Sequence, residues 1–391
     1  MSRKDLVRKW DDKGFKLDKI ENTLIRENTA QLLENQYTWI NEANASLSTD
    51  IADFKKIVMP LTRRIFPNLL ANEIVGVQPM AGPVGLAYAL RFRYKNTGGA
   101  DDMDEIGYNT VHPGYTGDGS TSGGGVTTSS GERWSSIDPT ATQDIPESGL
   151  TIERVQVDAA TRKLKARYSL EAMQDLKAMH DLDVESELVN MMQYEIAQEM
   201  DRELIARVTL AAQAGSTKAW VASAADTTST IGEQAKFRDL VTTIHKSLND
   251  IAIRTRRGPG NFIIASPNVI TALKAVDAYV IAPPRVDVNF QLGVAKQGVM
   301  NGNIDVYMDT FYATNPFTNG ADYVICGYKG AASNDNGIIF CPYIPVMISK
   351  AMEPGNFTPV VGVMSRYGIV SNLFGSNLYY SYISCDFSGI F

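Results

Sequence analysis

Cysteine is scarce in this sequence. Three occur among 391 residues, at Cys326, Cys341 and Cys385. A sparse, odd-numbered set without CxxC spacing excludes a disulfide framework and offers no zinc-binding pattern. Isolated cysteines of this kind are usually small buried hydrophobic residues. We therefore predict three buried thiols in a protein made in a reducing compartment.

Histidine is equally scarce, and motifs of known chemistry are missing. The three histidines, His112, His180 and His245, have no second histidine or cysteine three or four positions away. The sequence also lacks GxSxG, HExxH and Gly-Lys-Ser/Thr motifs. A catalytic or metal centre needs such groups brought together. We expect no enzyme activity, no cofactor and no bound metal.

A surplus of basic charge is missing too. The formal net charge is −7 and the calculated isoelectric point is about 5.2. Proteins that grip duplex DNA neutralise phosphates and are normally basic. No window approaches the roughly 20 apolar residues of a membrane span, and residues 1–5 lead into no apolar signal segment. We expect a soluble protein that is neither a DNA binder nor a membrane protein.

Two charged clusters have ordinary interpretations. Residues 101–105 read Asp-Asp-Met-Asp-Glu but lack the glycine and the alternating oxygen ligands of a calcium loop. A solvated acidic loop is the favoured interpretation, and a metal-dependent hydrolase built on this loop is the enzyme alternative.

Arginines 254, 256 and 257 precede Gly-Pro-Gly, which we expect to end a helix. Basic residues are favoured at the C-terminal end of a helix because they interact with its dipole, so these arginines need no phosphate ligand.

A long amphipathic helix is the clearest element that is present. Ser169 is suited to capping its first part, and Asp183 to capping a second part after a hesitation at 181–183. Apolar residues then follow at a spacing of three to four: Val184, Leu188, Met191, Met192, Ile196, Met200, Leu204 and Val208. We expect all of them, Met191 included, to face the core of a helix about 40 Å long.

The remaining pattern predicts a mixed α+β protein. Another helical stripe covers 237–251, and a helix beginning at Ser266-Pro267 extends to about 279. Alternating segments at 151–157 and 162–168, joined by a turn at 158–161, predict a hairpin. Further strands are expected at 73–80, 86–94, 261–265, 304–308, 323–326, 338–341 and 360–364.

Two regions look unable to fold alone. Residues 95–150 contain almost no aliphatic side chains and centre on a Gly/Ser-rich run at 117–125. Ordering about 50 such residues costs on the order of 50–100 kcal/mol, which a neighbouring subunit can supply. Residues 15–42 read as one very polar amphipathic helix, with Leu17, Leu32 and Leu33 on a broken stripe. We expect this helix to be an arm that needs a partner.

Four further stretches of the sequence are distinctive: Arg63–Leu70 with Val75–Met80, Lys165–Glu171 with Gln174–Ala178, Gly260–Ser266, and Gly327–Gly330 with Tyr367–Ile369. These stretches resemble the major capsid proteins of T-even-like tailed bacteriophages. They occur in the family's order and cover most of the chain from about 57 to 372. Four such stretches in order are a more specific signal than any one alone.

The resemblance implies the tailed-phage major capsid shell fold, an α+β architecture. Its parts would be an N-terminal arm (1–56), the first part of a peripheral domain (57–86), an extended loop (87–150) and the peripheral domain with its spine helix (151–239). An axial domain (240–340) would follow, and then a return to the peripheral domain (341–391).

The resemblance also implies a function. The chain would be a structural subunit of an icosahedral head, assembling into hexamers and pentamers around double-stranded DNA. It would reside in the virion after assembly in the host bacterial cytoplasm. Expected partners are copies of itself, a scaffold, a portal, a prohead protease and vertex proteins. A decoration protein could replace the inserted domain that familiar relatives carry in the extended loop.

A processing site follows from the same resemblance. The family's prohead protease favours an aliphatic residue, any residue and then Glu, and Ile40, Glu42 and Ala43 match this pattern. Leu32-Leu33-Glu34 is a weaker match. Cleavage after Glu42 would remove the amphipathic arm.

Two further structural classes stay open at this point. An encapsulin-like nanocompartment shares the shell fold but encloses enzymes and lacks virion association. A tail sheath or tube subunit would assemble helically instead of icosahedrally.

Overall fold

The structure is a computed structural model. It describes residues 3–20, 22–43, 69–94, 106, 115–117, 124–134, 145–180, 183–222, 233–276, 279–281, 294–318, 320–330, 335–353, 358–373 and 375–387. The chain forms two compact units. The first contains residues 1–85, 157–251 and 259–391, and the second contains residues 86–156 and 252–258.

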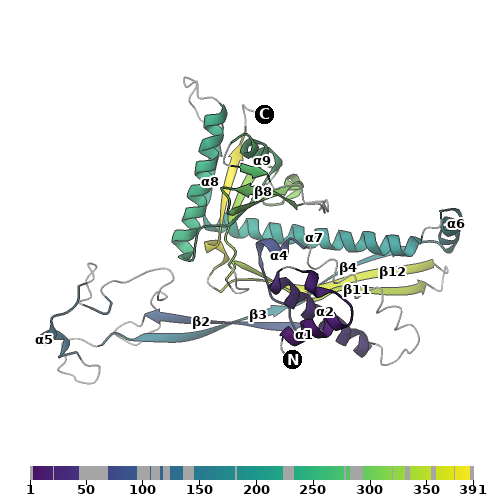
Figure 1. The fold of residues 1–391 in the computed structure, drawn as a ribbon, viewed down its shortest axis with the longest axis horizontal. Coiled ribbons are helices and arrows are strands. Elements are labelled where there is room, and N and C mark those ends of the chain that lie inside the picture. The colour runs from purple at the N-terminus through teal and green to yellow at the C-terminus, as the bar shows by residue number, and fades with distance from the viewer. Residues whose placement is uncertain are drawn as a thin grey trace. The chain divides into compact units, whose positions relative to one another are not determined.

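A seven-stranded sheet organises one part of the first unit (Figure 1). Its strand order is β5-β13-β10-β6-β9-β8-β7. The strands are β5 (Thr217–Val221), β6 (Phe262–Ala265), β7 (Tyr279–Ile281), β8 (Val294–Met300), β9 (Ile304–Asp309), β10 (Asp322–Gly327) and β13 (Tyr380–Asp386). Helices α8 (Glu233–Thr255) and α9 (Pro267–Lys274) cover one face, where Ile263, Val324 and Ile383 are buried.

A four-stranded sheet forms the other part of the first unit. Its order is β1-β11-β12-β4, with β1 (Gly76–Val77), β11 (Ile338–Glu353), β12 (Thr358–Ser371) and β4 (Ala160–Arg167). Strand β12 alternates: Val361, Val363 and Ser365 are buried, whereas Val360, Gly362 and Met364 are partly exposed. One face of this sheet is therefore a core face. The other is partly exposed at Val360–Met364 but buried near Ile339 and Cys341, which pack with Met80 and Val157.

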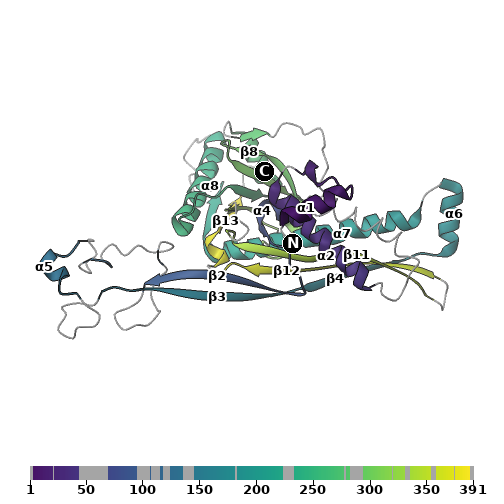
Figure 2. The ribbon, with the colours of Figure 1, turned by 60° about the horizontal axis from the view of Figure 1, so that its bottom comes forward.

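Helix α7 (Val184–Gly215) lies between the two sheets (Figures 1 and 2). Its buried residues share one apolar cluster with Phe262 and Ile325 of the seven-stranded sheet and with Val361 and Val363 of the four-stranded sheet. Its 32 residues span about 48 Å at 1.5 Å per residue. As predicted, Asp183 caps α7 by accepting a hydrogen bond from the Glu185 amide. Ser169 caps the preceding α6 (Leu170–His180) through the Ala172 amide.

One predicted core residue of this helix is exposed. The Met191 side chain is 70% exposed in the subunit, so the expectation that it faces the core was wrong. The buried stripe runs through Met192, Ile196, Met200 and Leu204. At 100° per residue, Met191 lies about 140° around the helix from Ile196 and therefore on the far side.

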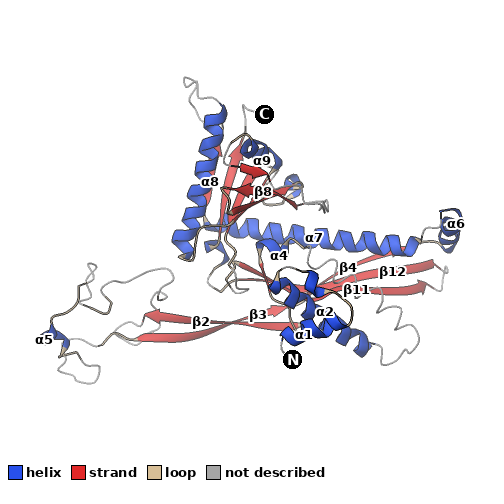
Figure 3. Cartoon of the chain, viewed as in Figure 1, coloured by secondary structure: helices blue, strands red, loops and turns tan. Residues whose placement is uncertain are grey.

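The predicted hairpin at 151–168 is also wrong. Strand β3 (Ser148–Asp158) pairs with β2 (Val84–Tyr94), whereas β4 pairs with β12 (Figure 3). Ala159 alone separates β3 from β4, and its amide bonds to the Pro83 carbonyl. Residues 158–161 were expected to form a turn, but they read Asp-Ala-Ala-Thr and include no glycine that would help to reverse the chain. At its end, β3 instead packs closely against β12 at Gly368. A Cβ at position 368 would lie only 2.5 Å from the Val157 side chain, so a glycine is needed for this close approach.

The second unit contains a two-stranded ribbon of β2 and β3. Arg93 forms a 2.8 Å ion pair with Glu153 across it, and the Ile106 amide donates to the Phe92 carbonyl at 2.7 Å. Its large apolar side chains are widely exposed: Leu86, Phe92, Leu150 and Ile152. An isolated two-stranded ribbon is marginally stable in water. We therefore expect these exposed apolar side chains to be buried against another surface.

The N-terminal region differs from the single predicted helix. It contains α1 (Arg3–Asp12), a 3-10 turn at Leu17–Lys19 and α2 (Thr23–Ala43). Left-handed backbone at Gly14 and Lys16 (φ 87° and 49°) ends the first helix. Trp10, Leu17 and Leu33 form a small core between these helices. The polar helix therefore finds its partner within the chain.

Short elements complete the fold. They are α4 (Ala71–Ile74), α5 (Thr128–Gly131) and 3-10 turns at Tyr312–Thr314 and Ser376–Leu378. Of the expected strand at 73–80, only Gly76–Val77 is a strand, because α4 occupies its first residues. Among the described helices, none has both the length and the apolar character needed to cross a bilayer.

Candidate functional site

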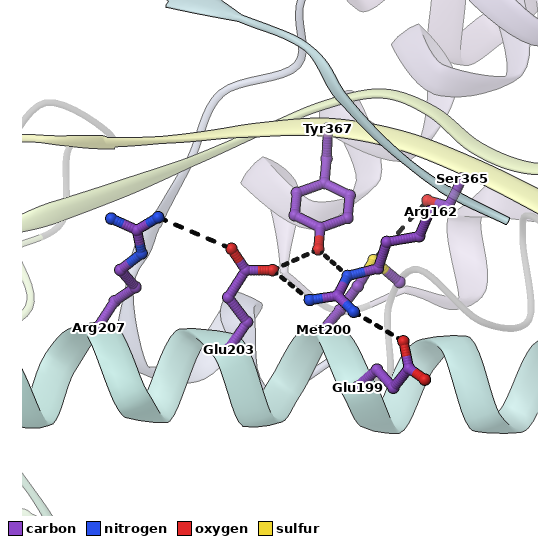
Figure 4. Close-up of polar contacts among 7 residues, drawn as sticks. All are labelled: Arg162, Glu199, Met200, Glu203, Arg207, Ser365 and Tyr367. Carbon is purple, nitrogen blue, oxygen red and sulfur yellow. Dashed lines mark hydrogen bonds and ion pairs between the residues drawn. The ribbon is translucent and has the colours of Figure 1, made fainter. Parts of the chain in front are cut away.

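A polar network joins α7 to the four-stranded sheet (Figure 4). Arg162 on β4 donates to Glu199 at 2.7 Å and to Glu203 at 2.6 Å, both on α7. The hydroxyl of Tyr367 on β12 accepts from Arg162 Nε and donates to Glu203 at 2.6 Å. Three elements far apart in sequence therefore meet at one guanidinium.

The hydrogen bonds and ion pairs of this network shift the pKa values of Arg162, Glu203 and Tyr367. Burial lowers the pKa of Arg162, but hydrogen bonds with Glu203 and Tyr367 outweigh it and hold the pKa above its ordinary value. Burial raises the pKa of Glu203, yet hydrogen bonds from Tyr367 and Arg162 bring it below its ordinary value. Burial and the bond to Glu203 raise the pKa of Tyr367 to about 12. At neutral pH, a cation, an anion and a neutral hydroxyl therefore share this network.

A second network joins α7 to the seven-stranded sheet. Arg202 of α7 pairs with Asp309, whose side chain is fully buried at the end of β9. Asp309 also accepts hydrogen bonds from the Tyr323 hydroxyl at 2.5 Å and from the Phe311 amide at 3.0 Å. Burial, together with Asp309, raises the pKa of Tyr323 above its ordinary value. Three donors satisfy this carboxylate, as a buried charge requires.

The two networks flank an open cavity of about 390 Å³. Its lining includes Arg162, Glu199, Arg202 and Glu203. These charges are paired with one another or with Asp309. Within the described ranges, no group of three or more His, Cys, Asp or Glu side chains could hold a metal ion. The chemistry that this arrangement supports is cohesion between α7 and both sheets.

Asp201, also on α7, is a carboxylate whose burial is only partly compensated. One of its carboxylate oxygens is buried without a hydrogen-bond partner, and a hydrogen bond with the Leu70 backbone favours the ionised form. Burial nevertheless raises its pKa to about 7. In an unfolded chain the same group titrates near 4. Folding therefore favours the protonated form.

We expect Asp201→Asn to stabilise the subunit at pH 8 and to change little at pH 4. Below pH 4, Asp201 of the unsubstituted protein is protonated in both the folded and the unfolded chain. Burying it then involves no buried charge and does not lower the free energy of unfolding. Between pH 4 and 7 the unfolded chain loses this proton first, so stability falls as pH rises, and the penalty is complete above pH 7. After discounting for partial exposure, the gain at pH 8 is about 1–3 kcal/mol.

Urea denaturation at pH 4, 6 and 8 measures this effect. Asp239→Asn, an exposed substitution on α8, is the matched control for the loss of one charge. Equal shifts for both variants at every pH would contradict the assignment to Asp201.

Side-chain amides dock the N-terminal helix α2 on the four-stranded sheet. Asn28 donates to the Val77 carbonyl at 3.2 Å, Asn35 to the Met80 carbonyl at 2.7 Å, and Gln36 to the Val346 carbonyl. Strand β1 is an edge strand, so α2 satisfies carbonyls that the sheet leaves open. Leu32 is fully buried in the main core.

The two candidate processing sites occupy different positions on α2. Ile40, Glu42 and Ala43 lie in its last turn, and their side chains fall outside the described residues. The weaker candidate lies mid-helix, where Leu32 and Leu33 are buried. Glu34 pairs with Lys9 at 2.7 Å and accepts from the Trp10 indole at 3.1 Å.

The structure also locates the other residues considered from the sequence. Cys326, Cys341 and Cys385 are buried and free, as predicted, and burial raises the pKa of each thiol. His180 is exposed at the end of α6, and His245 lies 2.8 Å from the Asn301 amide. His112 and the acidic run 101–105 lie outside the described residues.

Sequence reasoning missed the networks around α7. Arg162 was noticed only as a member of an alternating strand, and the roles of Glu203, Tyr367 and Asp309 were not anticipated. The available signal was that Arg162 shares the inward row of β4 with Leu164 and Ala166. A charged residue on such a row needs a buried partner.

All three sets of contacts join elements of the chain to one another. A family model described as major capsid protein Gp23 matches residues 51–135 and 119–386. The major capsid protein of Salmonella phage ViI is 30% identical over 381 residues, covering 88% of this chain and 84% of that protein. That of Enterobacteria phage T4 is 30% identical over 428 residues, covering 88% and 80%.

Solved phage structures are similar at lower identity. A Mycobacterium phage Adephagia chain has a TM-score of 0.46 at 10% identity, covering 81% of this chain and 89% of that one. The capsid of Myoviridae Phage XM1 has a TM-score of 0.45 at 9% identity, covering 80% and 89%.

The chain is therefore a structural subunit of a phage head shell, located in the virion capsid. It belongs to the major capsid protein family of tailed phages, with the α+β shell fold expected of that family. The nanocompartment alternative is not favoured.

Proposed function

We propose that this chain assembles with copies of itself into hexamers and pentamers that close into an icosahedral shell around double-stranded DNA. The family match, which extends from residue 51 to residue 386, carries this proposal. The net charge of −7 suits a wall that does not adhere to the DNA inside it. Residues 101–105 then have no catalytic role, and the protein is not an enzyme.

The extended loop, residues 87–150, lies across a neighbouring subunit in this proposal. The exposed apolar side chains of the ribbon, Phe92, Leu150 and Ile152 among them, support it. Burying them against a second copy contributes about 1.5–3 kcal/mol for each fully covered side chain. Mutual coverage around a capsomer produces large interfaces of the obligate type.

The domain assignment follows the family. The N-terminal arm is 1–56, and the peripheral domain combines 57–86, 151–239 and much of 341–391 around α7. The axial domain is 240–340. Because β5 and β13 belong to the seven-stranded sheet, we extend the axial domain to include 217–221 and 380–386.

Accessory partners are proposed on the same basis. They are a scaffold, a portal, a prohead protease, vertex proteins and a decoration protein. A decoration protein fits because residues 117–125 are a Gly/Ser-rich run where familiar relatives carry an inserted domain.

We propose that the prohead protease cleaves after Glu42 and removes α1 and α2. With the protease co-expressed, Glu42→Ala should leave the full-length chain intact, because the acidic residue of the motif is lost. Intact mass of the assembled chain measures this. Glu34→Ala is the matched control and should be processed normally, since Glu34 lies mid-helix, pairs with Lys9 and follows the buried Leu32 and Leu33. Processing of Glu42→Ala at the parental position would exclude this site.

Electron microscopy of the purified protein tests the proposed function. Closed icosahedral shells built from hexamers are expected. Helical tubes would instead indicate a tail subunit. Discrete small oligomers under all assembly conditions would overturn the proposal.

A further inference from the structure

The face of the four-stranded sheet that lies away from α7 is open along residues 163–167 of β4 and 360–364 of β12. Strands β4 and β12 pair side by side, and every second pair faces away from α7. These pairs are Lys163–Met364, Lys165–Gly362 and Arg167–Val360. The β12 members of these pairs are partly exposed and the β4 members are exposed. A Cβ built on Gly362 would meet only two backbone oxygens, both at 3.8 Å. This part of the face is therefore open, unlike the end at Ile339 and Cys341, which is buried.

The open face is basic. Lys163, Lys165 and Arg167 alternate along the edge strand, so they are about 6.6 Å apart and span about 13 Å. Arg167 pairs with Glu353 at 2.7 Å, and both side chains are substantially exposed. Lys163 and Lys165 form no ion pair with any described residue. Two unpaired cations therefore flank a shallow strip of small and apolar residues.

The same chain carries a segment of complementary charge. Residues 101–105 contain four carboxylates within five residues, with no compensating cation among them. The run ends beside Ile106, whose amide bonds to Phe92 on the ribbon strand β2. A five-residue segment reaches at most about 17 Å, which is long enough to contact both Lys163 and Lys165, about 6.6 Å apart. Ile106 thus tethers the acidic run to the loop proposed to reach a neighbour.

We infer that the acidic run 101–105 of one copy docks on the basic strip Lys163–Lys165 of a second copy. This inference rests on the proposed function, in which the extended loop lies across an adjacent subunit. The attraction between the acidic run and the two lysines determines where on the neighbouring subunit the loop binds, and it disfavours binding elsewhere. The alternative role of the lysines is to keep an edge strand from pairing with other chains.

A charge-swap experiment separates the two roles. Lys163→Glu with Lys165→Glu keeps charges on the edge strand but reverses the sign of the strip. Asp102→Lys with Asp104→Lys reverses the sign of the run. We expect each pair alone to reduce shell yield at least about tenfold at low salt, where the Debye length is about 10 Å or more. The quadruple variant keeps the net charge of −7 and should recover to within about threefold of the parent.

Matched measurements decide the outcome. Lys246→Glu with Lys274→Glu, two exposed lysines on α8 and α9, controls for net charge and should assemble normally. Circular dichroism establishes that each subunit is folded. Normal shells from the Lys163/Lys165 variant would overturn the inference and leave edge protection as their role. Failure of the quadruple variant to recover would also overturn it, because a different partner would then occupy the strip. Neither result affects the proposed function, which the formation of parental shells tests separately.

Discussion

We expect the Leu204→Asp subunit to lose cooperative folding. Leu204 is 1% exposed on α7, in the cluster shared by both sheets. An aspartate at this position would lie in an apolar cluster. An unpaired buried charge destabilises the folded state by several kcal/mol. Since small domains are stable by about 5–15 kcal/mol, the loss approaches the whole margin. Thermal unfolding followed by circular dichroism measures it.

Met191→Asp is the matched control on the same helix. Its 70% exposure predicts a change within about 0.5 kcal/mol in the isolated subunit. Leu204→Ala should lie between the two, with a loss of about 2–5 kcal/mol from the lost contacts and the cavity. A Leu204→Asp subunit that melts like the parent would contradict the position of α7 between the sheets.

Deleting residues 115–130 should leave a folded subunit that assembles at least about tenfold less well. None of the described residues in this range, 115–117 and 124–130, belongs to the buried clusters of the first unit, so we expect that unit to fold without them. The deletion shortens the loop proposed to cover a neighbour, and the lost contact repeats at every interface of the shell. Sedimentation of assembly reactions measures the yield.

The control replaces residues 115–130 with a Gly/Ser sequence of equal length. If chain length alone allows the loop to reach its neighbour, this variant should assemble better than the deletion. Normal shells from the deletion itself would refute coverage by this part of the loop.

Local signals predicted the elements of the fold better than their pairing. Asp183 and the apolar spacing that follows it located α7, and Ser266-Pro267 located the start of α9. The error at 158–161 arose because strand pairing is a long-range property. Strand β4 pairs with β12, about 200 residues later, and no local pattern records that choice. Helix periodicity was too coarse to separate Met191 from Met192, which differ by 100° around the axis.

The processing motif at Ile40–Ala43 can be proposed from the sequence alone and stays a prediction. The structure adds that the alternative motif includes the buried Leu32 and Leu33. The Arg162 network brings together residues separated by up to 205 positions, so sequence spacing could not reveal it. An arginine on an inward strand row was the one local indication that a distant carboxylate had to exist.

Strand β13 has a consequence for synthesis of the protein. It lies inside the seven-stranded sheet between β5 and β10, yet it is the last described strand of the chain. While the ribosome is still translating earlier residues, β5 has no strand beside it and one edge of β10 is open. A chain terminated before Tyr380 therefore cannot complete this sheet. Prematurely terminated products should be degraded as unfolded chains and should not enter growing shells as defective subunits.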